Sequence, residues 1–164
     1  METEIKNLVI DETYSGLIDA GWCFKLQGNL EVTGSLTVNL KRWLIVSGHI
    51  EAGGGIKAGW GIKAGEGIKA GWGIEAGEGI EAGLGIEAGA GIEAKYLNVA
   101  LRIFAGLLLG RIPVPAEMEI RAKVLSGTVS YGIVVEPKNE DTNHDQRKQA
   151  VRKRITEKYG GQSW

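Results

Sequence analysis

Few residues of this chain have the types and spacing that catalysis or metal binding requires. Its two histidines, His49 and His144, lie far apart in the sequence, and the only cysteine, Cys23, precedes Phe24, where a small core thiol is the simplest interpretation. We find no Ser-His-Asp order, metal-ligand spacing or phosphate-binding loop, and the many Gly-x-Gly units lack the strand and long helix of a nucleotide-binding motif. The sequence therefore predicts no enzymatic activity, no cofactor and no metal site.

Aromatic and charged residues at glycine-rich corners are better candidates, and they indicate binding. Trp22, Trp60 and Trp72 each lie two residues before an apolar residue, at a corner where the side chain should point outward. A three-sided winding, with three six-residue words per coil, would stack four corner residues along one edge, in the order Trp22, Arg42, Trp60 and Glu78. An arginine between two indoles would form a cation–π ladder, which either shields the backbone or acts as a recognition strip. The candidate binding residues at corners are Trp22, Arg42, Trp60, Trp72, Glu66 and Glu78.

The C-terminal segment is a second candidate surface. Val151, Ile155 and Tyr159 fall four residues apart, which is a helical period, and the two glycines that follow can end a helix. Most of the other residues there are polar, and the basic candidates are Arg147, Lys148, Arg152, Lys153 and Arg154. Two interpretations stay open: a solvated helix that docks by its apolar edge, or a contact with nucleic acid or an acidic protein.

A six-residue repeat must position the corner residues. From Ile50 to Ile92 an isoleucine recurs at every sixth position, followed by a charged residue and then by alanine. Alternate side chains on a strand point to opposite faces, so Ile-(Lys/Glu)-Ala forms a short strand with its charge outward. Gly-x-Gly forms a corner, where glycine reaches positive φ. The repeat therefore predicts a β-helix, whereas a flexible glycine-rich linker would not keep this spacing.

Charge pairing predicts the number of strands in each coil. With three six-residue words per coil, Lys69 lies between Glu51 and Glu87, and four of five outward neighbours have opposite sign. With two words per coil, three of six neighbours are alike. Like charges in register destabilise a sheet, so three sides are favoured. The corner residues alternate between Trp and Glu with a 12-residue period, which favours two sides unless it records tandem duplication.

The six-residue spacing extends beyond the perfect repeat on both sides. Ile18 is the first predicted inward residue and Leu109 the last, which gives about five coils. We predict an all-β fold, a three-sided β-helix closed by a C-terminal strand pair and a short terminal α-helix. The strand pair would form either a hairpin or a final coil. The predicted parts are an N-terminal cap at 1–17, the β-helix at 18–110, the capping strands at 111–137, and a linker with the basic helix at 138–164.

Apolar residues also occupy outward positions near the end of the predicted β-helix. Ala100, Phe104 and Leu108 are outward in the predicted register, so that this face should be covered. A C-terminal segment of the same chain or a second copy would cover it. In a homodimer the predicted interface consists of Phe104, Leu108, Val151, Ile155 and Tyr159.

Composition restricts the class of partner. The net charge of −1 provides no overall field that steers the chain toward nucleic acid or a membrane. No apolar run is long enough to cross a bilayer and no N-terminal signal pattern is present, so we expect a cytoplasmic protein without membrane contact.

Two resemblances bear on function. The stretch from Leu26 to Val38, LQGNLEVTGSLTV, resembles the bactofilins, which are polymer-forming β-helical cytoskeletal proteins. The word Gly-Ile-Glu-Ala-Gly is similar to that of short phage and prophage proteins, and small proteins of that type commonly occlude a host complex. We therefore expect a non-enzymatic binding protein, an inhibitor of a host defence complex whose protein partner is unidentified. A self-assembling structural solenoid is the alternative.

Overall fold

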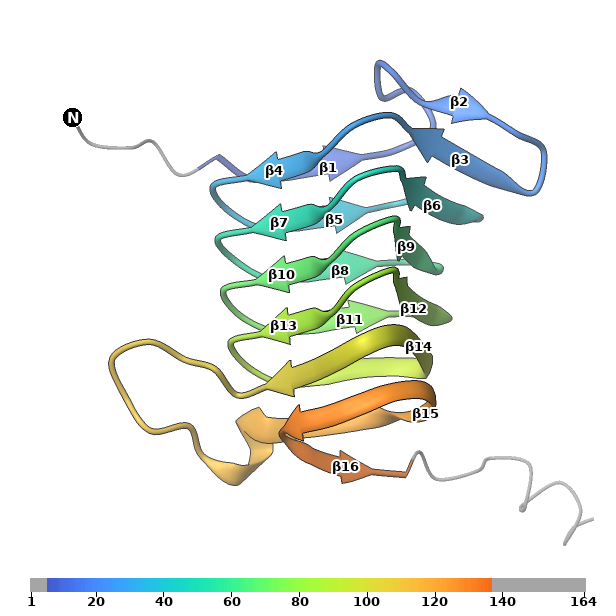
Figure 1. Cartoon of the computed structure of the whole chain (residues 1–164). Helices are drawn as coiled ribbons and strands as arrows, with labels where there is room; N and C mark the ends of the chain where they lie inside the picture. The colour runs from blue at the N-terminus through green and yellow to red at the C-terminus, as the bar shows by residue number, and fades with distance from the viewer. Residues whose placement is uncertain (1–5, 137–164) are drawn as a thin grey trace, which may run out of the picture.

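The computed structural model describes residues 6–136, which form an all-β solenoid of stacked coils (Figure 1). Its only helical element among these residues is the 3-10 turn η1 (Pro115–Met118). None of the described residues forms a helix long and apolar enough to cross a membrane. The strands are β1 (Leu8–Ile10), β2 (Ile18–Asp19), β3 (Cys23–Leu26), β4 (Leu30–Val32), β5 (Leu36–Val38), β6 (Trp43–Val46), β7 (Ile50–Ala52), β8 (Ile56–Ala58), β9 (Ile62–Ala64), β10 (Ile68–Ala70), β11 (Ile74–Ala76), β12 (Gly79–Ala82), β13 (Ile86–Ala88), β14 (Ile92–Ala105), β15 (Glu119–Tyr131) and β16 (Ile133–Val135).

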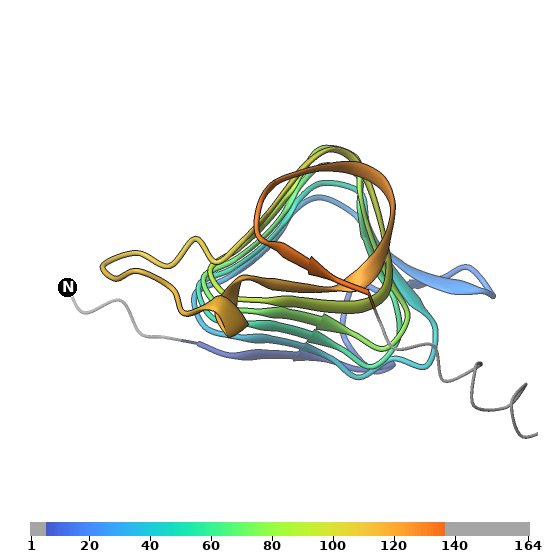
Figure 2. The same ribbon diagram turned by 90° about the horizontal axis from the view of Figure 1, so that it is seen from below.

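Three columns of parallel strands form the three faces of the solenoid (Figure 2). Face A comprises β1, β5, β8 and β11, face B comprises β3, β6, β9 and β12, and face C comprises β4, β7, β10 and β13. The long strands β14 and β15 each continue around all three faces. Within the perfect repeat, Ile56 pairs with Ile74, eighteen residues on. The predicted three-sided winding is therefore confirmed.

The core is a stack of the inward repeat residues. Each short repeat strand has the same burial pattern, with buried isoleucine and alanine on either side of an outward charge; Ile62 and Ala64, for example, are fully buried. No polar or charged residue is buried among residues 6–136. The interior is therefore held by apolar burial alone, as strand alternation predicts.

The solenoid has about six coils rather than the predicted five, because β15 winds a further coil after β14. Its first rung also differs from the prediction. Strand β1 pairs in parallel with β5 and supplies a first rung. Ile18, the predicted first inward residue, is half-exposed in β2, which pairs antiparallel with β3 outside the coil. The Gly21 N–H donates to Asp19 Oδ1 at 2.8 Å and turns the chain between these two strands.

The C-terminal end also differs from the prediction. Leu109 is 99% exposed rather than inward, because the chain leaves the coil at Gly106. Of the two predicted forms of the strand pair, the structure has the final coil and not the hairpin. One continuous strand, β15, winds a further coil in parallel with β14 and is followed by the short β16. The predicted terminal helix, with its basic and apolar residues, lies outside the described residues, as does His144. Its contact with nucleic acid stays a prediction.

The repeat glycines serve close approach rather than positive φ. None of the glycines between residues 53 and 91 has positive φ, which corrects the expectation from sequence. A Cβ at Gly71 would lie 2.1 Å from the carbonyl oxygen of Gly53, and one at Gly89 would lie 2.0 Å from that of Gly71. Glycine is required there because each corner rests directly on the backbone of the neighbouring coil.

Candidate binding face

The predicted corner residues lie on three different edges. Backbone pairing places Trp22, Arg42 and Trp60 along the edge between faces A and B, followed by Glu78, as predicted. Trp72 lies on the edge between faces C and A, because its N–H donates to the Gly54 carbonyl oxygen of the preceding coil. All three tryptophans are exposed, but they do not form a single strip.

Arg42 does not stack between indoles. Its guanidinium lies over the ring of Phe24, 4.0 Å from the centroid, and donates to both carboxylate oxygens of Asp19 at 2.7 and 2.9 Å. The hydrogen bond from Arg42 lowers the pKa of Asp19. The predicted ladder is therefore wrong, and this arginine instead fastens the β2–β3 loop to the solenoid.

The two predicted corner glutamates pair with neighbouring coils. Glu78 forms an ion pair with Lys95. His49 Nδ1 lies 3.7 Å from Glu66 Oε2, and His49 Nε2 lies 3.0 Å from Glu31 Oε1. Within residues 6–136, no group of three or more His, Cys, Asp or Glu side chains has a geometry that could hold a metal ion.

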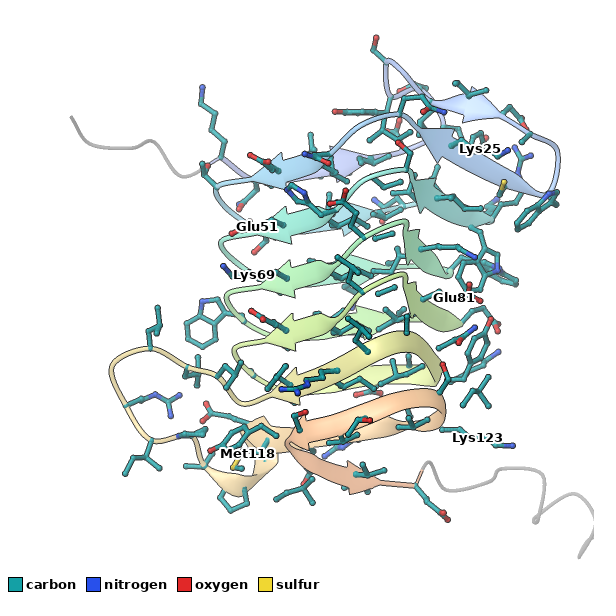
Figure 3. The ribbon with its side chains drawn as sticks, viewed as in Figure 1. Lys25, Glu51, Lys69, Glu81, Met118 and Lys123 are labelled. Atoms are coloured by element: carbon teal, nitrogen blue, oxygen red, sulfur yellow. The ribbon has the colours of Figure 1, made fainter. Side chains whose placement is uncertain are left out.

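On face C the column of outward charges, of which Figure 3 labels Glu51 and Lys69, ends at Glu87 and is followed by Phe104. Lys69 is in register with Glu51 on one side and Glu87 on the other, and Lys69 Nζ lies 3.4 Å from Glu51 Oε1. In the next coil Phe104 is in register with Glu87 and is half-buried. The outward position of Phe104 predicted from the sequence is confirmed.

Two grooves flank this column and share Lys69 and Glu87. The first, the Phe104 groove, has a volume of about 740 Å³ and is bordered by the exposed side chains of Leu84 and Leu101. The second, the Trp72 groove, has a volume of about 510 Å³ and lies between Trp72 and residues 107–109. Trp72 and Leu108 thus come together in one groove, and Phe104 lies in the groove beside it.

The wall of the Trp72 groove belongs to a loop, residues 106–118, that is held by its own contacts. Arg111 Nη1 donates to Glu117 Oε2 at 2.8 Å, and the Val114 N–H donates to the same oxygen at 3.0 Å. These hydrogen bonds, that of Arg111 first, lower the pKa of Glu117 to about 2. The loop therefore presents Leu109 and Ile112 to solvent in a defined conformation, with both side chains at least 90% exposed.

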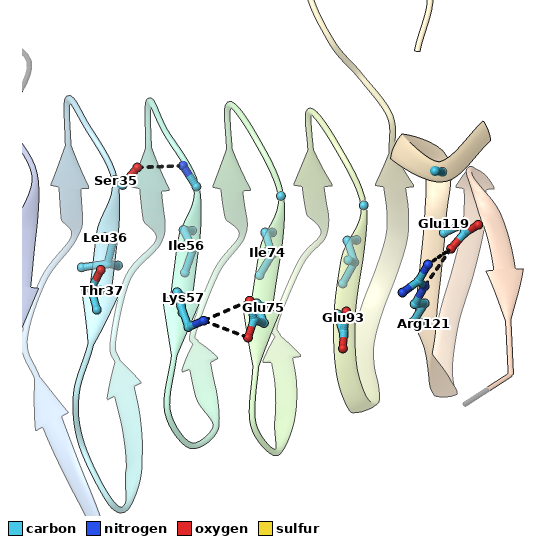
Figure 4. Close-up of a pocket in the computed structure, with 15 residues that line it drawn as sticks. Ser35, Leu36, Thr37, Ile56, Lys57, Ile74, Glu75, Glu93, Glu119 and Arg121 are labelled. Atoms are coloured by element: carbon cyan, nitrogen blue, oxygen red, sulfur yellow. Dashed lines mark hydrogen bonds and ion pairs between the residues drawn. The ribbon is translucent and has the colours of Figure 1, made fainter. Parts of the chain in front are cut away.

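Face A has a different character (Figure 4). Its groove, of about 450 Å³, is lined mainly by charged side chains and glycine backbone. Lys57 Nζ lies 3.2 Å from Glu75 Oε1, and Arg121 Nη2 lies 2.7 Å from Glu119 Oε2. These charges are paired with one another, so face A offers less apolar contact than face C.

Several residues of these grooves were not predicted from the sequence. They are Leu84, Leu101, Arg102, Leu107 and Leu109. The signal was present, since Leu84 replaces the Trp or Glu of other corners and three consecutive leucines precede Gly110. The face that Leu107 and Leu109 join depends on the path of the loop, which does not follow from the repeat.

The fold defines the chain as a β-solenoid protein. The chain matches no protein-family model, and no curated protein and no solved structure is significantly similar to it. The resemblances to bactofilins and to phage proteins therefore gain no support from these comparisons.

Proposed function

We propose that this chain is a non-enzymatic binding protein that presents face C to a protein partner. One observation carries the proposal: two grooves flank a single charged column, and exposed apolar side chains border both of them. Trp72 and Leu109 border one groove, and Leu101 borders the other. Exposed apolar patches edged by polar residues are typical of protein interaction sites, and here the charged column lies between two such patches.

The chemistry of this surface supports a protein partner. Trp72, Phe104 and Arg102 are of the residue types that are enriched at interface cores. The charged centre, Glu51 with Lys69 and Glu87, would set the register of a partner that carries complementary charges. A rigid coil stack also loses little conformational freedom on binding, which favours affinity.

The finer proposal concerns the identity of the partner. The repeat word of the chain is similar to that of short phage proteins, and this similarity is the reason to propose a host defence complex as the target. A preformed, rod-shaped surface suits occlusion of such a complex, because occlusion requires no turnover by the inhibitor.

Affinity capture followed by measured binding tests the proposal. Wild-type protein is used to capture partners from a bacterial lysate, and the affinity for the partner identified by mass spectrometry is then measured by calorimetry. Trp72→Ala and Leu109→Ser should each weaken binding about tenfold or more, which corresponds to about 1.4 kcal/mol. Trp22→Ala is the matched control, because this indole is at least as exposed as Trp72 but lies on another edge. Unchanged affinity in both face C variants would contradict the proposal.

A self-assembling solenoid is the second candidate function. The C-terminal end favours self-assembly. Among the described strands β16 pairs only with β15, so its other edge has no described partner. At the N-terminal end, however, β2 pairs antiparallel along β3 and obstructs the addition of a parallel coil. Sedimentation velocity separates the two functions, because filaments at micromolar concentration would favour self-assembly over binding by a single chain.

A further inference from the structure

Aromatic rings and lysines occur together along face B and its edge with face A. Figure 3 labels Lys25, Glu81 and Lys123, which follow one another along this side of the solenoid. Most coils carry one aromatic residue and one lysine there. In coil order these pairs are Trp22 with Lys25, Trp43 with Lys41, Trp60 with Lys63, and Tyr96 with Lys95. These residues, together with Lys123 in register with Tyr96, form the face B strip.

The two central rings of the strip lie flat on the sheet. A Cβ at Gly61 would lie 2.6 Å from the ring of Trp43, and one at Gly79 would lie 2.4 Å from the ring of Tyr96, so each ring covers a glycine. Both aromatic side chains are only half-buried, so the ring faces turned away from the glycine backbone are open to solvent. The two ring centroids are 6.3 Å apart. Open ring faces of this kind are stacking surfaces for nucleobases.

The strip also has an excess of positive charge. Lys63 Nζ lies 2.9 Å from Glu81 Oε2, and Lys95 pairs with Glu78, so the two carboxylates in the middle of the strip are neutralised. The exposed lysines of the strip that have no ion pair among residues 6–136 are Lys25, Lys41 and Lys123. This side of the solenoid is therefore positive, although the whole chain has a net charge of −1. Lysines in line with stacking aromatic rings are the combination that binds single-stranded nucleic acid.

We propose that face B binds a single strand of nucleic acid, whose bases stack on Trp43 and Tyr96 while the unpaired lysines bind its phosphates. Neighbouring strands of a sheet lie about 4.8 Å apart, so the strip from β3 to β15 is about 24 Å long. At about 3.4 Å per nucleotide of a stacked strand, it spans at most about seven nucleotides. A duplex keeps its bases stacked on one another, so it cannot use the rings. The strip is separate from face C, and the inference stands whether or not face C binds a protein.

Fluorescence anisotropy of labelled oligonucleotides, titrated with the full chain, tests the proposal. Wild-type protein should bind octathymidylate and octauridylate more tightly than a blunt duplex, and the tighter of the two identifies DNA or RNA as the source of the strand. Trp43→Leu and Tyr96→Leu keep an apolar side chain over each glycine and should each weaken binding about tenfold. Tyr131→Leu is the matched control, because it removes an exposed ring from face C and should bind like wild type.

A charge variant keeps the test decisive if a ring variant fails to fold. Lys25→Gln combined with Lys123→Gln removes two phosphate contacts at exposed positions. The slope of the logarithm of the binding constant against the logarithm of salt concentration should therefore become shallower by about 1.4. Lys57→Gln combined with Arg121→Gln lowers the net charge equally on face A and should leave this slope unchanged.

The same titrations contain the results that would overturn the proposal. If wild-type protein does not bind the single strands, or if the strip variants bind them like wild type, the strand does not bind at face B. If the duplex binds as tightly as the single strands, the rings do not stack with bases. If polyglutamate binds as tightly as the oligonucleotides, the partner of this face is an acidic protein rather than a nucleic acid.

Discussion

The rings of Trp43 and Tyr96 meet across two intervening coils on face B, with centroids 6.3 Å apart and planes inclined by 38°. Gly61 and Gly79 lie between them in the same column. A Cβ at Gly61 would come within 2.6 Å of the Trp43 ring, and one at Gly79 within 2.4 Å of the Tyr96 ring. The two glycines therefore create the space in which both rings pack flat on the sheet.

This packing predicts how Tyr96 titrates. Burial, followed by the nearby carboxylates of Glu81 and Glu78, raises the pKa of Tyr96 above 10.0. Because the pKa is raised in the folded state, the contribution of the Tyr96 phenol to the free energy of unfolding is complete below pH 10. It is lost as the pH rises above that value. Trp43→Ala uncovers the phenol, so the pKa of Tyr96 should move back toward the ordinary value. NMR titration of labelled tyrosines measures this shift.

The exposed Trp60 provides the control for that titration. Trp60→Ala removes an indole from the neighbouring edge without uncovering the Tyr96 ring, so the pKa of Tyr96 should stay raised. A Tyr96 resonance that titrates at the ordinary pKa of 10.0 in wild-type protein would contradict the packing of the two rings.

Close stacking of corners predicts a sharp difference between two repeat glycines. Gly71→Ala places a Cβ 2.1 Å from the Gly53 carbonyl oxygen, so the backbone must shift. We expect a loss of about 2–3 kcal/mol in the free energy of unfolding. Gly59→Ala is the matched control, since its Cβ lies 3.5 Å from the nearest atom and should change stability by less than about 1 kcal/mol. Equal losses in denaturant unfolding would show that the corners are not stacked this closely.

The outward charges predict a rescue by exchange. Lys63 Nζ lies 2.9 Å from Glu81 Oε2 on face B. Lys63→Glu puts two carboxylates in register and should lower the free energy of unfolding by about 0.5–1 kcal/mol. Adding Glu81→Lys restores an ion pair with reversed polarity, so the double variant should recover most of the loss at low salt. A double variant no more stable than the single variant would show that these side chains do not face each other.

The loop at residues 106–118 should loosen in acid. The folded-state pKa of Glu117 is about 2, below its ordinary 4.5. A lowered pKa means that the contribution of this carboxylate is complete above pH 4.5 and is lost as the pH falls toward 2. Amide exchange of residues 107–114, corrected for intrinsic rates, should therefore accelerate in that range. In Glu117→Gln these amides should exchange fast already at neutral pH, with no further acceleration in acid. If the wild-type amides do not accelerate in acid, the pairing of Glu117 with Arg111 is contradicted.

Sequence periodicity predicted the winding well, because strand register and charge pairing both follow the fixed six-residue spacing of the repeat. Lys69 faces Glu51 and Glu87 as expected, and Glu75 also meets Glu93 as the expected exception. The predicted role of the repeat glycines was wrong, because the sequence does not show which neighbouring atoms would clash with a side chain at those positions. Ile18 was in phase with the repeat but lies outside the coil, because a local turn at Asp19 outweighs the period.

The candidate site could be predicted only in part. Trp72, Phe104 and Leu108 were recognised from their positions, and the structure brings them to adjacent grooves. Arg42 was assigned the wrong aromatic partner. Asp19 of β2 lies beside Arg42 and binds its guanidinium, which lies over the ring of Phe24. Such contacts depend on where irregular segments return to the coil, and a repeat carries no information about that.

The three-sided winding determines which residues share face C, and pyrene excimer fluorescence tests it most directly. In a chain with Cys23→Ala, the pair Lys57→Cys and Glu75→Cys is eighteen residues apart and adjacent on face A. The pair Lys63→Cys and Glu75→Cys is twelve residues apart, on faces B and A. After pyrene labelling, strong excimer emission is expected from the first pair and none from the second. Excimer emission from the second pair, or none from the first, would contradict the winding and with it the composition of the binding face.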